Sequence, residues 1–225
     1  MNAGIIVAVG SGGTMGGNVD RGFLNLGSAP VLAYSLQAFE RCPEIDTTIV
    51  IVKRDRIEAA QAVARMFGCA KVTTVIAGTS NRLLAIENAM AELDDDYKMV
   101  VVQDAYCPCV TTESVSKTIK TAKRYGSGVA ARRVEDSIKL VEKGQVIKKS
   151  LDPKTIWIAQ SPQAFKIDLL KKGIAAANKA KVTPDDESSA VELVTNDVRL
   201  VPVDGPNIRI NNADDLTLAA AILKL

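Results

Sequence analysis

The residues that could do chemistry begin in a glycine-rich stretch near the amino terminus. Six of the 15 glycines fall between residues 10 and 22, directly after an apolar run at residues 5–9. A buried strand, a glycine loop and then a helix are typical of a phosphate site, because the backbone N–H groups of the loop face the anion. A flexible surface loop is the alternative, and the preceding apolar run favours the site. Arg21, at the end of the stretch, is the candidate phosphate ligand.

The chain contains no histidine. This excludes a Ser/His/Asp triad, a Cys/His pair and a histidine-ligated metal, and leaves acid–base work to Asp, Glu, Lys or Tyr. Phosphoryl-type transfer remains open, because it depends mainly on positioning and charge neutralisation. Cys42, Cys69, Cys107 and Cys109 are too scattered for a disulfide framework or a metal site. Their pattern predicts a reducing, cytoplasmic compartment.

Composition narrows the class of protein. The 225 residues suit one α/β domain, and 47% hydrophobic residues are enough for a sizeable core. A net charge of +2 argues against a dedicated nucleic-acid binder. No apolar run approaches the ~20 residues that cross a bilayer, so no membrane partner is expected. Residues 1–9 lack the length and the basic start of a signal peptide.

The glycine loop differs from two common phosphate loops. Met15 stands where a dinucleotide fingerprint has its third glycine, and Gly-Gly-Thr stands where a Walker A loop has Gly-Lys-Ser/Thr. The loop is also longer than either of them before its helix begins. A longer loop of this kind predicts a site that wraps a triphosphate.

Alternating elements must position this loop. Apolar and β-branched runs predict strands at residues 5–9, 47–52, 72–76, 99–102 and 128–131. Helical spacing predicts helices at residues 30–42, 54–67, 80–93 and 112–125, with Ser80 as one N-cap and Gly126 as one stop. The alternation predicts right-handed crossovers and a mostly parallel sheet. Ligands bind beyond the carboxyl ends of such strands, which brings residues 78–82 and 104–109 to the rim that holds the glycine loop.

The pattern changes after residue 131. Residues 136–157 alternate weakly around a Glu142-Lys143-Gly144 turn and predict a projecting β-hairpin. An isolated hairpin is barely stable in water, so this arm is expected to pack on a partner subunit. Helices are predicted at residues 167–178 and 186–194, and short strands at 198–203 and 207–210. Asn212 is expected to cap a final helix that reaches Leu225.

Motifs along the whole chain resemble one family. Residues 8–15 and 21–24 resemble the loop signature of 2-C-methyl-D-erythritol 4-phosphate cytidylyltransferases and the related ribitol-phosphate enzymes. Residues 103–108, 136–139, 161–165, 185–190 and 207–210, together with Trp157, resemble further motifs of that family in the same order. Each motif is modest by itself, and their common order and spacing carry the resemblance.

The resemblance implies a Rossmann-like α/β nucleotidyltransferase fold, with a mostly parallel sheet flanked by helices. One domain would span residues 1–225, and a β-arm at 134–158 would join a homodimer. CTP and a polyol phosphate, 2-C-methyl-D-erythritol 4-phosphate first among them, would be the substrates, with Mg²⁺ as the divalent cation. The acceptor phosphate would attack the α-phosphate of CTP and release pyrophosphate, a step of isoprenoid biosynthesis.

The resemblance also implies roles for individual residues. The nucleotide would be bound by Ala8, Val9, Gly10, Gly12, Gly13, Gly78, Ser80, Arg82 and Ala85. The acceptor would be bound by Asp104, Cys107, Ser137, Pro153 and Asp185, with Asp104 also near the metal and Ser137 reaching the partner's site. Arg21, Thr14 and Arg209 stand at the catalytic positions. Two structural alternatives stay open. Arg82 could pair with Glu87 or Asp104, and residues 185–187 could simply cap a helix.

The charges of this chain depart from the family pattern. Of five cation positions, three hold Thr14, Cys107 and Pro153, while Arg21 and Arg209 replace lysines. Cations aimed at the developing charge lower the barrier to such a transfer. The alternatives are therefore a catalytically weak or silent nucleotide-binding homologue, or a nucleotidyltransferase with another base or acceptor. The basic residues that could stand in are Lys148, Lys149, Lys154, Arg132 and Arg133.

Overall fold

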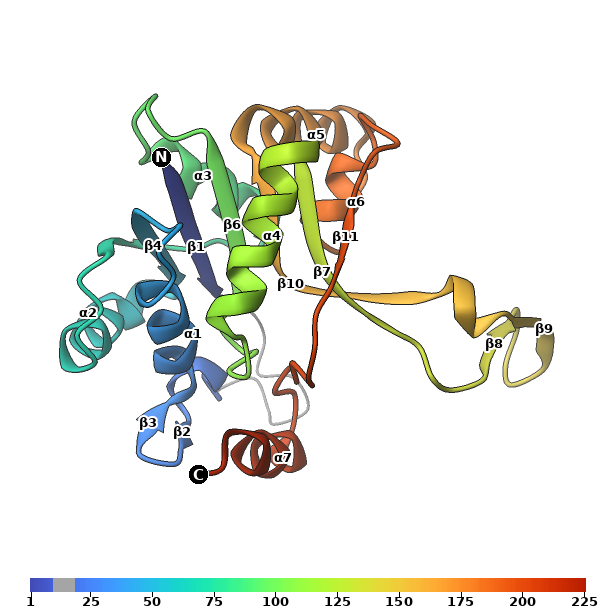
Figure 1. Ribbon diagram of the computed structural model, residues 1–225, viewed down its shortest axis with the longest axis horizontal. Coiled ribbons are helices and arrows are strands. Elements are labelled where there is room, and N and C mark those ends of the chain that lie inside the picture. The colour runs from blue at the N-terminus through green and yellow to red at the C-terminus, as the bar shows by residue number, and fades with distance from the viewer. Residues whose placement is uncertain (10–18) are drawn as a thin grey trace.

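A seven-stranded sheet forms the centre of the computed structural model, which describes residues 1–9 and 19–225 (Figure 1). Its strands are β1 (Asn2–Ala8), β4 (Thr47–Val52), β5 (Val72–Ala77), β6 (Met99–Asp104), β7 (Ser127–Arg133), β10 (Trp157–Lys166) and β11 (Leu200–Pro202). They lie in the order β11-β7-β10-β6-β1-β4-β5. Among these strands, only β10 is antiparallel to its neighbours, so the prediction of a mostly parallel sheet is confirmed.

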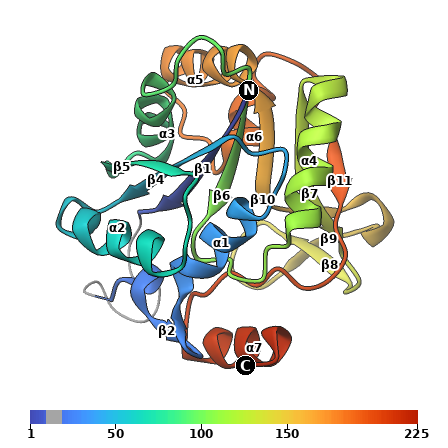
Figure 2. The same cartoon turned by 60° about the vertical axis from the view of Figure 1, so that its left-hand side comes forward.

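Helices cover both faces of the sheet (Figure 2). They are α1 (Val31–Glu40), α2 (Ile57–Met66), α3 (Arg82–Ala91), α4 (Thr112–Tyr125), α5 (Ile167–Ala180), α6 (Glu187–Val191) and α7 (Ala213–Leu223). Helices α1, α2 and α4 pack on one face, and α3, α5 and α6 pack on the other. Helix α7 lies beside a short hairpin of β2 (Asn25–Leu26) and β3 (Ala29–Pro30). Three short 3₁₀ helices complete the described elements: η2 (Arg21–Phe23), η3 (Arg54–Arg56) and η4 (Pro153–Thr155).

The central strands are buried on both faces, which explains their continuous apolar sequences. Successive side chains of a strand point to opposite faces. Ile6 of β1 therefore packs in the cluster that contains Phe39 of α1, and Ile5 packs in the cluster that contains Leu170 of α5. All four of these side chains are almost fully buried. The two clusters hold the carboxyl ends of the strands in fixed positions.

Capping residues set several helix boundaries, and two of these residues, Gly126 and Asn212, were predicted from the sequence. Helix α4 begins after Thr111, whose side chain accepts a hydrogen bond from the Ser114 N–H, and ends at Gly126 with φ +97°. Asn212 caps α7 through the Asp215 N–H. The prediction of Ser80 as the N-cap of α3 is wrong, because Asn81 accepts the hydrogen bond from the Leu84 N–H at 3.1 Å.

The structure differs from the predicted pattern in two further places. Residues 207–210 form no strand; their segment crosses the carboxyl edge of the sheet and is tied down by separate hydrogen bonds. The Ile210 N–H donates to the Tyr106 carbonyl at 2.8 Å, and Asn207 Nδ2 donates to the Ser161 carbonyl at 2.7 Å. The second difference is β10, which extends through residues 158–166, where no strand was predicted.

Strands β8 (Ile138–Val141) and β9 (Ile147–Leu151) form the predicted hairpin. It stands well away from the sheet at the end of the ribbon that β7 and β10 extend (Figure 1). Gly144 lies in its turn with φ +60°, a backbone conformation that favours glycine. We call residues 134–158 the arm.

None of the helices in the described ranges is long and apolar enough to cross a membrane. All four cysteines have free, buried thiols.

Candidate active site at the carboxyl edge of the sheet

A pocket of about 1040 Å³ opens at the carboxyl ends of β6 and β7. Five of the site residues predicted from the resemblance line it, namely Arg82, Asp104, Cys107, Asp185 and Arg209, and so do the two candidate stand-in cations Arg132 and Arg133. The five site residues come from four separate parts of the chain, which the sheet topology brings to one edge. This is the position at which open α/β sheets bind their ligands.

Asp104 ends β6 and points into this pocket. Its side chain is almost fully buried, and its Oδ1 accepts a hydrogen bond from the Tyr106 N–H at 2.9 Å. Its Oδ2 lies 2.7 Å from Nη1 of Arg209, whose side chain is half exposed. The carboxylate and the guanidinium thus neutralise each other at the pocket wall.

Asp104 also has the properties of a ligand for a divalent cation. Its Oδ2 is buried and lacks a well-directed hydrogen bond, although the charge of Arg209 is close. Within residues 1–9 and 19–225, no group of three or more His, Cys, Asp or Glu residues could enclose a metal. Mg²⁺ commonly binds through one or two carboxylates and completes its shell with substrate phosphates and water. A single carboxylate near the predicted triphosphate site would fit that pattern.

Arg21 is held below the surface. Its guanidinium carbon lies 4.0 Å from the centroid of the Tyr106 ring, and its Nη1 donates to the Ile210 carbonyl at 2.8 Å and to Asn211 Oδ1 at 2.9 Å. Burial, with the charges of Asp20 and Asp104 nearby, raises the pKa of Tyr106 to about 12, so its phenol hydroxyl stays protonated and uncharged. Arg21 therefore links the residues after the glycine loop to the 207–211 segment.

Arg82 pairs with a residue that the sequence did not suggest. Its Nε lies 2.7 Å from Glu187 Oε1 and its Nη2 lies 3.3 Å from Oε2, so it pairs with neither of the alternative partners Glu87 and Asp104. Burial would lower the pKa of Arg82, but the charge and hydrogen bonds of Glu187 outweigh it and raise that pKa. The pair spans 105 residues of sequence and joins the start of α3 to the start of α6.

Asp186 organises the neighbouring wall. Its carboxylate accepts hydrogen bonds from Gln163 Nε2 at 2.8 Å and from the Ser189 N–H at 2.8 Å. Burial would raise the pKa of Asp186, but the hydrogen bonds from Gln163, Ser188 and Ser189 outweigh it and lower that pKa. As expected for this segment, Asp186 caps α6, and it remains ionised beside the pocket.

Cys107 is buried at the position where the family pattern has an arginine. Burial and then the charge of Asp104 raise the pKa of its thiol, which therefore stays neutral. A neutral thiol is a poor nucleophile and carries no positive charge for a phosphate. This wall of the pocket consequently depends on other cations.

The predicted nucleotide side lies near the end of β1. Ala8 is buried there, and a Cβ added to Gly78 would lie only 2.4 Å from Val9 Cγ1, so this close approach requires glycine. Ser80 is exposed beside it. Ala85 is fully buried in the cluster beneath α3, so it offers no surface to a base.

Other predicted residues lie outside this arrangement. Gly10, Gly12, Gly13 and Thr14 fall outside the described residues. Ser137 is exposed and Pro153 half-buried on the arm, and neither lines this pocket. Sequence reasoning missed Glu187 and Gln163 as members of the site. Their only signal was that they fall within motifs 185–190 and 161–165.

Comparison with known proteins identifies the family. The model of the 2-C-methyl-D-erythritol 4-phosphate cytidylyltransferase family matches residues 3–225. The protein of that name from Geobacter metallireducens is 30% identical over 224 residues, which cover 98% of this chain and 96% of the relative. The protein of that name from Clostridium tetani is also 30% identical, over 99% of this chain and 90% of the relative.

Solved structures give the same result for the fold. The 4-diphosphocytidyl-2C-methyl-D-erythritol synthase of Anaerococcus prevotii superposes with a TM-score of 0.87 at 22% identity, covering 100% of this chain and 96% of that one. A second synthase of the same name superposes with a TM-score of 0.80 at 28% identity, covering 99% and 98%. The Rossmann-like nucleotidyltransferase fold is therefore established for this chain.

Proposed function

The chain belongs to the 2-C-methyl-D-erythritol 4-phosphate cytidylyltransferase family, and we propose that it transfers the cytidylyl group of CTP to 2-C-methyl-D-erythritol 4-phosphate. A phosphate oxygen of the acceptor attacks the α-phosphorus of CTP. The bond from that phosphorus to the bridging oxygen of the β-phosphate breaks, and pyrophosphate leaves. The product contributes to isoprenoid biosynthesis.

One observation carries this proposal. The family match extends over residues 3–225, and the matching motifs supply the pocket residues Asp104, Asp185 and Arg209. A resemblance confined to the glycine loop would support only nucleotide binding. Family motifs that converge on one pocket support the whole transfer.

The described residues suit a reaction that needs positioning more than proton transfer. Arg209 is half exposed at the pocket wall and supplies a cation for an incoming phosphate. Arg21 holds the 207–211 segment in place from below. Asp104 would hold Mg²⁺, which neutralises phosphate oxygens when it is bound.

Pyrophosphate release tests the proposal. The protein is incubated with CTP, Mg²⁺ and 2-C-methyl-D-erythritol 4-phosphate, and pyrophosphate is measured with a coupled assay. We expect release that depends on all three additions, and release at the background rate would overturn the proposal. Ribitol 5-phosphate in place of the first acceptor, and ATP, GTP or UTP in place of CTP, define the preference for acceptor and base.

The charges at the pocket favour a second candidate, a homologue that binds CTP but transfers slowly, or that uses a less anionic acceptor. Arg82 is bound by Glu187, Arg209 by Asp104, and the thiol of Cys107 is neutral. Apart from the exposed Arg132 and Arg133, which also line the pocket, these contacts leave less positive charge for two phosphates than the family pattern has. Calorimetry that detects CTP binding, together with no pyrophosphate from either acceptor, would support this candidate.

We also propose a homodimer joined through the arm. Leu140, Val141, Val146 and Ile147 are 44–75% exposed on a two-stranded sheet, which is a poor unit by itself in water. A partner's arm would bury them and would bring Ser137 and Pro153 toward the other pocket. Free, buried thiols support a reducing cytoplasm as the compartment.

Light scattering tests the dimer. Val146→Asp together with Ile147→Asp is expected to yield monomers, because two charges would be buried in the interface. The control is Val182→Asp, at a site that is 48% exposed between α5 and α6 and away from the arm. A dimer that survives the double substitution would argue against the arm as the interface.

A further inference from the structure

The Arg82–Glu187 pair joins two segments of the chain at the pocket. Arg82 is the first residue of α3 and follows the 78–81 segment, the predicted nucleotide side. Glu187 is the first residue of α6 and follows Asp185 and Asp186, which also line the pocket. Both helices lie on the same face of the sheet, where Leu83 and Ala190 belong to one apolar cluster.

Both carboxylate oxygens of Glu187 are engaged by Arg82. Its side chain is 1% exposed, and its two oxygens face Nε and Nη2 of Arg82 at 2.7 and 3.3 Å. Arg82 is 28% exposed, and its neighbours Asp104 and Asp186 add further negative charge. The guanidinium group of Arg82 is thus directed at carboxylates of the protein itself.

Stability alone is a weak reason for such a pair. Desolvating two charges costs about as much as their attraction returns, and apolar side chains of similar volume often stabilise equally well. A two-point contact instead fixes an orientation, which a single ammonium or an apolar contact does not. What is oriented here is the start of α6, a helix of five residues.

Two other contacts show how closely α6 is placed. Gln163 of β10 binds both Asp186 and the Ser188 N–H, at 2.8 and 3.0 Å. A Cβ added to Gly173 of α5 would lie 2.8 Å from the Ala190 carbonyl oxygen. The sheet and α5 thus hold α6 from two sides, and Arg82 holds it from the third.

We propose that Arg82 is a positioning residue that acts through Glu187 on the acceptor wall at Asp185 and Asp186, and is not a ligand of the nucleotide. The proposal rests on the cytidylyl transfer proposed above. It assigns Arg82 differently from the sequence prediction, which placed it among the nucleotide ligands. It also makes Glu187, whose side chain is only 1% exposed and faces Arg82, necessary for acceptor binding.

The test compares Arg82→Lys, Glu187→Gln and the double variant. Both single variants are expected to raise the acceptor KM about 10- to 100-fold, because a small displacement of a binding wall is costly. The Kd for CTP, measured by calorimetry, should change by less than about threefold. Since the two residues act as one unit, the double variant should be no worse than about the poorer single variant.

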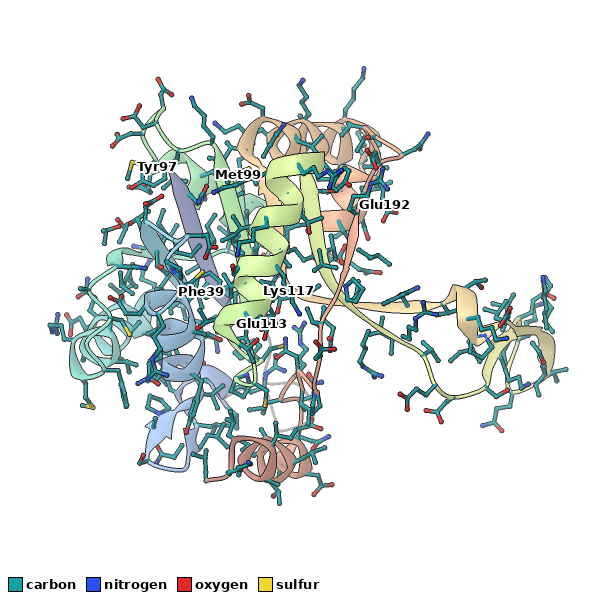
Figure 3. The ribbon with its side chains drawn as sticks, viewed as in Figure 1. Phe39, Tyr97, Met99, Glu113, Lys117 and Glu192 are labelled. Atoms are coloured by element: carbon teal, nitrogen blue, oxygen red, sulfur yellow. The ribbon has the colours of Figure 1, made fainter. Side chains whose placement is uncertain are left out.

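The competing roles give different results. A nucleotide ligand predicts that Arg82→Lys weakens CTP binding while Glu187→Gln leaves it unchanged, and this outcome would overturn the proposal. A purely structural pair predicts a lower melting temperature with an unchanged acceptor KM, which would overturn it as well. Glu192→Gln is the matched control, because Glu192 is exposed at the outer end of α6 (Figure 3) and should alter neither constant.

Amide hydrogen exchange separates this proposal from the proposed function. The amides of residues 186–191 should exchange about tenfold faster in Arg82→Lys and in Glu187→Gln, since the start of α6 loses one of its three supports. Unchanged exchange in both variants would overturn the positioning role even if the protein is an active transferase. Faster exchange in a protein that releases no pyrophosphate would instead overturn the proposed function and leave the mechanical link intact.

Discussion

Two cavities of nearly equal volume lie at opposite ends of the same sheet. The pocket at the carboxyl edge measures about 1040 Å³, and a cavity at the amino edge, beside Met1, Lys98 and Gly126, measures about 1050 Å³. Volume does not distinguish them. The arrangement of their charges does.

Charges at the carboxyl edge are fixed by buried partners. Glu187 and Asp104 are 1% and 5% exposed, and each faces an arginine at 2.7 Å. At the amino edge, Lys98, Lys123 and Lys172 are exposed on long side chains. Their exposure resembles that of the Glu113–Lys117 ion pair on the outer face of α4 (Figure 3), where both partners remain in solvent.

The difference follows from the direction of the strands. Six of the seven strands in the sheet run the same way, so the loops that follow them gather at one edge and carry side chains from distant parts of the chain. The opposite edge receives mostly helix ends and turns. A cavity becomes a candidate site when buried charges converge on it, and the following substitutions test this distinction.

Removal of Arg82 should have the largest effect on stability. Arg82→Met leaves the carboxylate of Glu187 buried without its partner, and should cost about 3–5 kcal/mol of unfolding free energy. Adding Glu187→Leu to that variant should restore most of the loss. Urea denaturation measures both, and the comparison fails if Lys123→Met at the amino edge is equally destabilising.

Asp104→Asn should have the largest effect on turnover. It removes the negative charge that would hold Mg²⁺, and the rate of cytidylyl transfer should fall about 10²- to 10³-fold. The melting temperature should stay close to that of the parent. Asp46→Asn is the control at the other edge, where Asp46 Oδ2 accepts a hydrogen bond from the Asn2 N–H at 2.6 Å; equal losses of turnover would contradict the distinction.

Glu44 is the charged side chain at the amino edge whose hydrogen bonds shift its pKa most, and its substitution should change stability without changing turnover. A hydrogen bond from Ser116, with smaller contributions from Cys42 and Lys120, lowers the pKa of Glu44 from 4.5 to about 2. A lowered pKa stabilises the folded state above pH 4.5, and this stabilisation is lost as the pH falls toward 2.

Glu44→Gln should therefore be less stable than the parent at pH 7, by about 1 kcal/mol after allowance for solvent screening. Thermal unfolding between pH 7 and pH 2 should show the two curves converging at the acidic end. A gap that widens as the pH falls would contradict the assignment. Turnover at pH 7 should be unchanged.

Lys172→Ala should have the smallest effect. Its ammonium is exposed at the amino edge, and turnover and CTP affinity should each change by less than about twofold. A loss of CTP binding in this variant would identify the amino-edge cavity as a second anion site and would break the comparison.

Local signals explain which elements were predictable. The β-branched run at residues 47–52 predicts β4 with its observed bounds, and Gly126 marks the predicted end of α4. Strand β10 was missed at residues 158–166 because Gln160, Ser161 and Pro162 give no strand pattern. Its stability comes from hydrogen bonds to β6 and β7, which lie far away in the sequence.

The sequence by itself determined the alternation of strands and helices from β1 to β7, the family, and the edge at which residues 78–82 and 104–109 lie. Periodicity, caps and motif order are local properties, so they can be read without coordinates. Only the tertiary structure decided that Arg82 pairs with Glu187, that Arg21 lies beneath Tyr106, and that Ala85 is enclosed. Each of these three contacts joins residues that are far apart in the sequence. Such residues meet, and exclude water from a charge or an apolar surface, only when the helices pack on the sheet.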